Sequence, residues 1–257
     1  AQSLGVDQIV NFSKELGIYE NPDALLSLSL GSTETTLLKL TSAYSAFING
    51  GKLVEPILID RVQDSEGNTI LNNDKRACVN CSQISYLSND YPKVKDKYKK
   101  VFSPQTAFQI TSLLEGVVQR GTGKKLKNLQ LNLAGKTGTT NENTDAWFIG
   151  YTSNLVVGVY VGMDNPSPLG KFETGSKTAL PIFKNFVKKA VKKYDARPFK
   201  VPEGITMMVI DPTNGEKAKF SSKNTIVESY KSKNIINGTV QYSNYDRVES
   251  NNILKFY

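Results

Sequence analysis

The segment from Gly135 to Thr140 has residue types and spacing that could do chemistry. Apolar residues lead into it and predict a strand, which carries one cation and several hydroxyl groups. Alternation places Lys136 and Gly138 on one face of this strand, and Thr137 and Thr139 on the other. Gly138 leaves space for a ligand or another backbone to come close. A strand that simply ends in a turn would explain the same residues, so the tripeptide Lys136-Thr137-Gly138 is a weak signal on its own.

A strand of this composition suits the rim of a groove that holds an extended peptide. Its backbone can pair with the peptide as an added strand, and the N–H of Thr139 can donate to an oxyanion. Lys136 can attract a substrate carboxylate or aid proton transfer, and the hydroxyl of Thr137 or Thr139 can bind that carboxylate. The candidate catalytic residues are therefore Lys136, Thr137 and Gly138. The candidate substrate-binding residues are Thr137, Thr139 and Thr140, and the candidate oxyanion donor is Thr139.

Composition restricts the other kinds of active site. The chain has no histidine, which excludes Ser-His and Cys-His catalytic pairs and most zinc sites within it. A serine or cysteine nucleophile would need lysine or tyrosine as its base. No metal and no cofactor is expected.

The two cysteines, Cys78 and Cys81, have Cys-x-x-Cys spacing in a polar loop at 72–89. A structural zinc would need two further ligands, and a thioredoxin-like motif would open a helix after a strand. We expect a local disulfide, with free thiols as the main alternative and a redox or metal role as a further one. A disulfide would fit an oxidising compartment.

The charge of the chain is basic and comes mostly from lysine. Its 257 residues are 39% hydrophobic, which suits a packed core, and its net charge is +8. A nucleic-acid surface would rely more on arginine, and no recognition motif accompanies the lysines, so no nucleic-acid partner is expected. The lysine-rich run at 93–100 predicts a solvated loop. No stretch approaches the roughly 18 apolar residues of a membrane helix.

Apolar periodicity predicts the main elements. Expected helices are one capped by Asp7 and stopped by Gly17, then 36–49, 103–120 and 178–193. Expected strands are 54–62, 69–71, 131–139, 145–151, 155–162 and 205–210. The expected buried stripe of the helix at 103–120 is Ile110, Leu113, Leu114, Val117 and Val118. Gly121 is expected to end that helix in the left-handed conformation.

Three strands followed by a helix favour an α+β fold, with an antiparallel sheet backed by helices, or a three-layer arrangement. The composition changes after residue 197. Residues 1–197 are therefore expected to form one domain with a polar insertion at 72–100, and residues 198–257 a carboxyl-terminal extension. A small hairpin is expected around the turn at 211–215.

Several segments together resemble the class A penicillin-binding proteins of the 1A type, the bifunctional murein synthases. Lys-Thr-Gly is a motif of penicillin-binding proteins and class A β-lactamases, and the other segments make the resemblance more specific. These segments are 1–7, Leu30-Gly-Ser32, the helix at 41–51 with its double glycine, Gly116 to Gly123, Gly135 to Thr140, Asp145 to Tyr151 and Ala179 to Phe183. The resemblance covers most of residues 1–210.

The resemblance implies the carboxyl-terminal half of a transpeptidase domain with a β-lactamase-like fold. In such a domain a serine in Ser-x-x-Lys is acylated by a stem peptide that ends in D-Ala-D-Ala. The acyl group then passes to an amine on a neighbouring strand, and β-lactams trap the serine. The implied partners are peptidoglycan stem peptides and β-lactams. The implied location is the periplasmic face of the bacterial inner membrane, reached through an upstream segment.

The chain departs from the family pattern in one large respect. No serine is followed by lysine three residues later, and Ser-x-Asn occurs only at Ser222, Ser232 and Ser250, after Lys136 and in the wrong order. We expect the nucleophile, its lysine, the second motif and a glycosyltransferase domain to lie upstream, so this chain alone is not expected to acylate. A serine β-lactamase, a D,D-carboxypeptidase and a non-catalytic peptide-binding remnant are the alternatives.

Overall fold

The centre of the molecule is an antiparallel sheet of β5 (Ala134–Thr139), β6 (Ala146–Tyr151) and β7 (Val156–Val161), in that order. The computed structural model describes residues 1–74, 76–79, 93–95, 98–191, 197–219, 224–236 and 239–240. β6 is the central strand and pairs with both neighbours along its whole length. The three predicted strands are confirmed, although β5 begins at Ala134.

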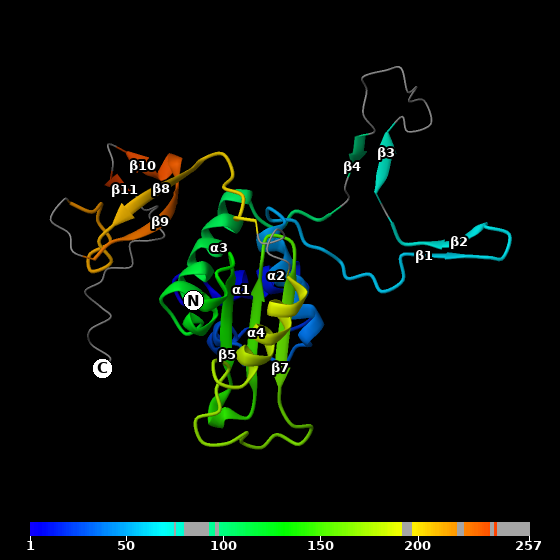
Figure 1. The fold of residues 1–257 in the computed structure, drawn as a ribbon, viewed down its shortest axis with the longest axis horizontal. Helices are drawn as coiled ribbons and strands as arrows, with labels where there is room; N and C mark the ends of the chain where they lie inside the picture. Colours follow the sequence, from blue (N-terminus) through cyan, green and yellow to red (C-terminus); the bar gives the residue numbers. More distant parts are fainter. Residues whose placement is uncertain are drawn as a thin grey trace.

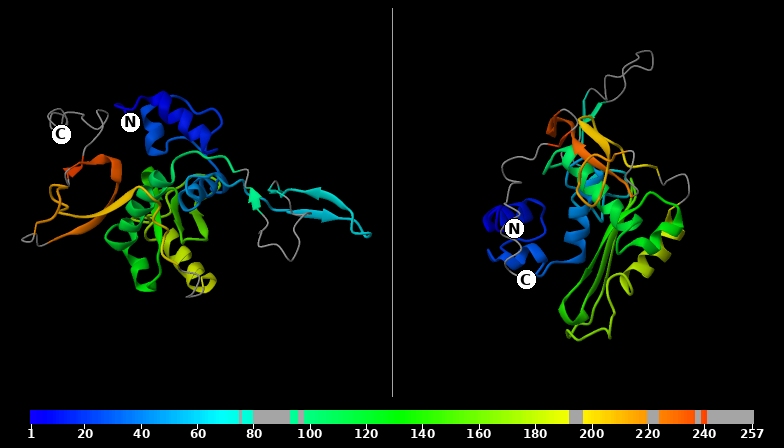
Figure 2. Two further views of the ribbon diagram at one scale, coloured as in Figure 1. Left: turned by 90° about the horizontal axis from the view of Figure 1, so that it is seen from above. Right: turned by 90° about the vertical axis from the view of Figure 1, so that its left-hand side faces the viewer.

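Helices cover both faces of this sheet (Figure 1). α4 (Ala179–Ala190) packs on one face, and α2 (Leu37–Ile48) and α3 (Pro104–Gln119) pack on the other. Figure 2 shows α4 and the amino-terminal helices on opposite sides of the sheet. The expected α+β class, an antiparallel sheet backed by helices, is confirmed in a three-layer form.

The two layers of side chains differ in character. Beneath α4, Phe148 of β6 and Phe183 of α4 are both 0% exposed, and their ring centroids are 4.7 Å apart. A Cβ at Gly150 would lie 2.7 Å from the Phe183 ring, so only glycine lets the two elements come this close. On the opposite face, the Tyr151 hydroxyl donates to Oγ1 of Thr111 at 3.2 Å, which satisfies a polar group that would otherwise be costly to bury.

α3 begins as the sequence predicts. The Ser103 hydroxyl accepts a hydrogen bond from the Thr106 N–H at 3.2 Å, and Pro104 occupies the first turn. Two details of the prediction are wrong. Leu113 is 55% exposed, because the buried face runs through smaller residues such as Thr111 and Gly116. Gly121 is not left-handed.

The amino-terminal segment holds α1 (Val6–Glu15) and η1 (Leu26–Leu30). The expected cap by Asp7 is wrong: Gly5 is the N-cap, and no side chain caps the helix. Asp7 lies in the first turn, where its negative charge favours the helix dipole. Short helical turns elsewhere are η2 (Lys124–Leu129), η3 (Asn141–Asn143) and η5 (Ser232–Asn234).

The described residues between 53 and 95 form an arm that extends away from the body (Figure 1). Its described elements are the ribbons β1 (Arg61–Gln63) with β2 (Thr69–Asn72) and β3 (Ala77–Val79) with β4 (Lys93–Lys95). The strand expected at 54–62 is wrong over most of its length, because β1 begins only at Arg61. The solvated loop expected at 93–100 is wrong at its start, because residues 93–95 form β4. Cys78 lies in β3 and is disulfide-bonded. Cys81 lies outside the described residues, so the predicted pairing stays a prediction.

The carboxyl-terminal segment forms a second small β-structure against α3. β8 (Ile205–Ile210) pairs with β9 (Ile226–Lys231), so the hairpin expected around 211–215 closes on a more distant strand. Arg120, the residue that follows α3, forms an ion pair with Glu228 at 2.5 Å. The short strands β10 (Ile235–Ile236) and β11 (Thr239–Val240) follow. The predicted domain boundaries stay predictions. None of the helices that the structure describes combines the length and the apolar character that a membrane span requires.

Candidate substrate-binding edge of the sheet

β5 carries the Lys-Thr-Gly segment and is an outer strand of the central sheet. The Thr140 N–H donates to the Asp145 carbonyl oxygen at 3.2 Å. Because hydrogen-bonded pairs alternate along an antiparallel ladder, Gly138 and Lys136 also direct their backbone groups toward β6. The backbone N–H and C=O of Thr137 and Thr139 therefore face the open edge, where no described strand pairs with them.

The Lys136 and Thr137 side chains both lie at this edge. Lys136 is exposed, and its Nζ donates to the Thr137 carbonyl oxygen at 2.7 Å. Thr137 is half-buried, and its Oγ1 is 2.9 Å from Oγ1 of Thr122. A cation and a hydroxyl therefore flank the same stretch of open backbone, an arrangement that suits an anionic group.

Thr139 and Thr140 have different surroundings. Oγ1 of Thr139 accepts a hydrogen bond from the Gly175 N–H at 3.0 Å, which leaves its own O–H free to donate. Oγ1 of Thr140 accepts from the Asp145 N–H at 2.8 Å and lies 2.7 Å from Oγ1 of Thr144. Thr140 therefore closes the β5–β6 turn, and its assignment to substrate binding stays a prediction.

The loop between β7 and α4 packs against the end of β5. Gly175 is buried, and a Cβ there would lie 2.4 Å from the carbonyl oxygens of both Gly138 and Trp147. Phe172 in this loop has φ of 67° and an exposed ring, with Nζ of Lys171 5.3 Å from the ring centroid. Gly175 and the neighbouring loop therefore define one side of the edge.

Gly138 and Trp147 face each other across β5 and β6. A Cβ at Gly138 would lie 3.1 Å from Cβ of Trp147, so the glycine permits this close pairing. Trp147 is half-buried, and its ring is 4.7 Å from that of Tyr160. The Tyr160 hydroxyl donates to Oδ1 of Asp145 at 2.8 Å, and this bond to a carboxylate raises the pKa of Tyr160.

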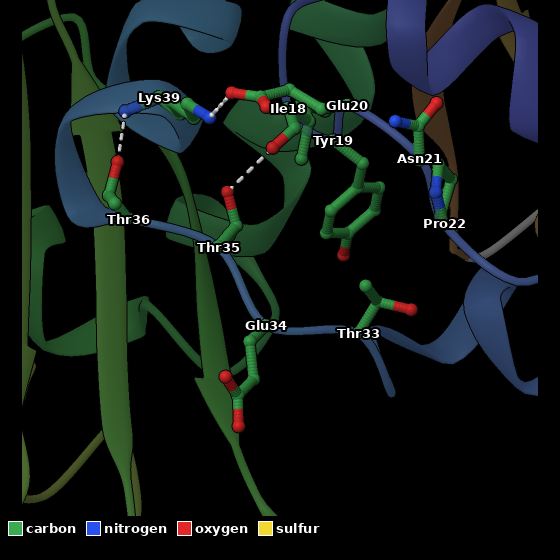
Figure 3. Close-up of a pocket in the computed structure, with 10 residues that line it drawn as sticks. All are labelled: Ile18, Tyr19, Glu20, Asn21, Pro22, Thr33, Glu34, Thr35, Thr36 and Lys39. Atoms are coloured by element: carbon green, nitrogen blue, oxygen red, sulfur yellow. Dashed lines mark hydrogen bonds and ion pairs between the residues drawn. The ribbon is translucent and has the colours of Figure 1, made fainter.

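The site is a strand edge rather than one of the two described cavities. A cavity of about 410 Å³ is lined by residues 18–22, 33–36 and 39, with Lys39 paired to Glu20 (Figure 3). A second, of about 600 Å³, lies around Ile48, Ser153, Asn154 and residues 197–200. Neither contains a residue of β5.

The described serines form no hydrogen bond with Lys136. Ser232 belongs to the carboxyl-terminal segment, where its hydroxyl is 2.8 Å from Oγ1 of Thr206. Ser222 and Ser250 lie outside the described residues. The described part of the chain also holds no group of three potential metal ligands.

The sequence profile of the penicillin-binding protein transpeptidase domain matches residues 3–188. The chain belongs to the penicillin-binding transpeptidase family. The resemblance inferred from the sequence is thereby confirmed, and it is supported by relatives over nearly the whole chain.

Penicillin-binding protein 1A of Rickettsia felis is 40% identical over 239 residues, covering 91% of this chain and 30% of the relative. Penicillin-binding protein 1A of Pseudomonas aeruginosa is 31% identical, covering 90% of this chain and 32% of the relative. The chain therefore spans about a third of the length of these curated relatives. The crystal structure of penicillin-binding protein 1A from Haemophilus influenzae is similar, with a TM-score of 0.74, 29% identity and 94% of this chain covered, against 38% of that chain.

Two residues of the site cannot be recognised from the sequence pattern alone. The sequence indicates only a turn after a helix at Thr122, and nothing in it distinguishes Gly175. The Gly-Thr-Gly spacing at 121–123 marks a turn at Thr122 but does not show that the turn lies beside β5. For Gly175 the signal is missing, because its contact with Thr139 joins residues far apart in the chain.

Proposed function

We propose that these 257 residues supply the substrate-binding half of a peptidoglycan D,D-transpeptidase domain in a class A penicillin-binding protein. The observation that carries the proposal is the open edge of β5, with Lys136 and two threonine hydroxyls beside it. The substrates are stem peptides of peptidoglycan, and β-lactams bind in their place. No nucleic acid takes part.

The edge can act on such a peptide in two ways. The outward N–H and C=O groups of Thr137 and Thr139 can pair with the extended peptide as an added strand. The Lys136 ammonium and the Thr137 hydroxyl can hold the terminal carboxylate by charge-assisted hydrogen bonds. This pairing fixes the scissile carbonyl relative to the strand.

The N–H of Thr139 is the candidate donor to the oxyanion. It faces the open edge, so a carbonyl oxygen of the paired peptide can approach it. A donor fixed by a β-strand needs no reorganisation when negative charge develops on that oxygen. Gly138, the preceding residue of the strand, keeps the approach free of a side chain.

The serine nucleophile and its lysine base belong to residues outside these 257, and the complete protein carries a glycosyltransferase domain as well. The protein works on the periplasmic face of the bacterial inner membrane, anchored by a segment outside this chain. The 257 residues bind and orient the peptide along the edge of β5, and the residues outside this chain supply the nucleophile that attacks it.

Acylation of the full-length protein by a fluorescent penicillin tests the proposal. Lys136→Ala is expected to lower the second-order acylation rate by roughly 100-fold, because it removes a charged group that binds the ligand carboxylate. Lys127→Ala, an exposed lysine in η2, is the matched control and should label like the wild type.

Unchanged labelling of Lys136→Ala would contradict the role given to this strand. Complete failure of the wild-type full-length protein to label would favour a non-catalytic remnant instead. Mass spectrometry of the 257-residue chain with a β-lactam should show no adduct, and an adduct on one of its serines would place the nucleophile inside the chain.

A further inference from the structure

The turn at 121–123 has a shape that places Thr122 beside the substrate-binding edge. The N–H groups of Gly121 and Gly123 both donate to the Val117 carbonyl oxygen, at 3.1 and 3.0 Å. A Cβ at Gly121 would lie 2.9 Å from Cα of Val117, and one at Gly123 would lie 3.2 Å from the Val117 carbonyl oxygen. Glycines on both sides are therefore what allow the chain to fold back against α3 and present Thr122 to β5.

Thr122 is exposed, and its hydroxyl forms a hydrogen bond with the Thr137 hydroxyl. Its Oγ1 lies 2.9 Å from Oγ1 of Thr137. A threonine hydroxyl has one proton to donate and can accept as well. When Thr122 donates to Thr137, Oγ1 of Thr137 acts as an acceptor in that bond, and the Thr137 proton remains available for a third group.

Thr139 has a similar arrangement, and here the direction of the hydrogen bond is fixed by its donor. The Gly175 N–H can only donate, so Oγ1 of Thr139 must accept, at 3.0 Å, and its proton is left for another acceptor. Thr137 and Thr139 lie on one face of β5, two residues apart. Two hydroxyls that each accept a hydrogen bond from the protein and keep their own proton form a pair of donors that suits an anion.

We propose that Thr122 is a positioning residue for carboxylate recognition: it donates to Thr137 and so aims the Thr137 hydroxyl at the carboxylate of the bound peptide or β-lactam. The inference rests on the proposed function and extends it to a residue outside the Lys-Thr-Gly segment. Thr122 does not contact the reacting atoms, so it acts through Thr137.

The test compares two ligands on the full-length protein. One is a penicillin with a free carboxylate and the other is its methyl ester, and the quantity measured is the ratio of their second-order acylation rates. Thr122→Val keeps the shape of the side chain and removes the hydroxyl. It is expected to lower the ratio by about tenfold, the effect of losing one oriented hydrogen bond to a charged group. Thr122→Ser should restore the ratio.

Two controls separate positioning from a general structural effect. Thr69→Val changes an exposed threonine of β2 and should leave both rates unchanged. Thr122→Val should add little to the effect of Thr137→Val in the double variant, because both changes remove the same interaction.

Equal loss of both rates in Thr122→Val would show a structural role and overturn the inference, and so would an unchanged ratio. If the wild-type protein is not acylated by either ligand, the proposed function fails and this inference fails with it. Acylation of the wild type with no change in Thr122→Val overturns the inference alone.

Discussion

Two regions of this chain are built from β-strands rich in apolar residues, yet only one of them is packed. In the central sheet, Phe148 is fully buried between its neighbours and α4. In the arm, every residue from 55 to 72 is exposed, and Leu58 is 99% exposed. The difference is the helical cover, which the sheet has on both faces and the described part of the arm does not have on either.

This difference in cover explains why the candidate site is assigned to the sheet and not to the arm. A two-stranded ribbon without a packed face is marginally stable in water, so the arm cannot hold a chemical group in a fixed position. β5 is an edge strand as well, but its inner edge pairs with β6 and the strand packs against α3. It therefore offers free backbone groups on a rigid support, which is what a peptide-binding edge requires.

The largest expected difference between the two regions is in stability. Phe183→Ala should lower the free energy of unfolding by about 3–5 kcal/mol, because it leaves a cavity against Phe148. Leu58→Ala removes a side chain that is already in water and should change it by less than about 0.5 kcal/mol. Urea denaturation of both variants measures the comparison, and equal effects would show that the arm is packed in solution.

A smaller effect is expected from glycine replacements. Gly175→Ala places a Cβ against the Gly138 and Trp147 carbonyl oxygens, which should cost about 1–3 kcal/mol and lower acylation of the full-length protein. Gly67→Ala lies in the arm with open space around it but a φ of 88°, so its cost should be only about 1 kcal/mol. Acylation that is unchanged in Gly175→Ala would separate the loop from the site.

The smallest effect concerns pH, and its sign differs between the regions. Burial raises the pKa of Glu115 in α3 above its usual 4.5, so this group favours folding at low pH and loses that contribution as pH rises through its folded pKa. Glu115→Gln should therefore raise the free energy of unfolding at pH 7, with a gain that disappears below about pH 4. A gain that persists in acid would contradict burial as its cause.

In the arm the sign is reversed. The Arg76 guanidinium holds the pKa of Asp74 at about 2. This pair therefore stabilises the local structure above the usual pKa of 3.8, and that stabilisation is lost as pH falls toward 2. Pepsin cleavage near β2 and β3 should increase over this interval and should already be fast in Asp74→Asn. The two pH ranges therefore report on the two regions separately.

The sequence predicts the packed region well and the arm poorly, for one physical reason. Periodicity records burial, so the three strands of the sheet and the helix after Ser103 can be recognised. The apolar run through Ile57 and Leu58 has the same pattern, but no described element covers it, and most of the expected strand does not form. The exposure of Leu113 does not follow from the pattern, because small residues of α3 face the sheet instead.

The residues of the candidate site also differ in whether the sequence predicts them. Lys136, Thr137 and Thr139 can be chosen from local pattern, because one strand carries them all. Thr122 and Gly175 cannot, because they meet β5 only through the fold, across 15 and 36 residues of sequence. Which hydroxyls accept and which are left to donate depends on those distant partners.

The most direct test is a crystal structure of the full-length protein acylated by a β-lactam with a free carboxylate. We expect the ligand to lie along the outer edge of β5, paired with backbone groups of Thr137 or Thr139. Its carboxylate should lie within about 3.2 Å of the Thr137 hydroxyl. An acylated ligand whose carboxylate is held elsewhere, with the edge of β5 left unpaired, would contradict the role of this strand.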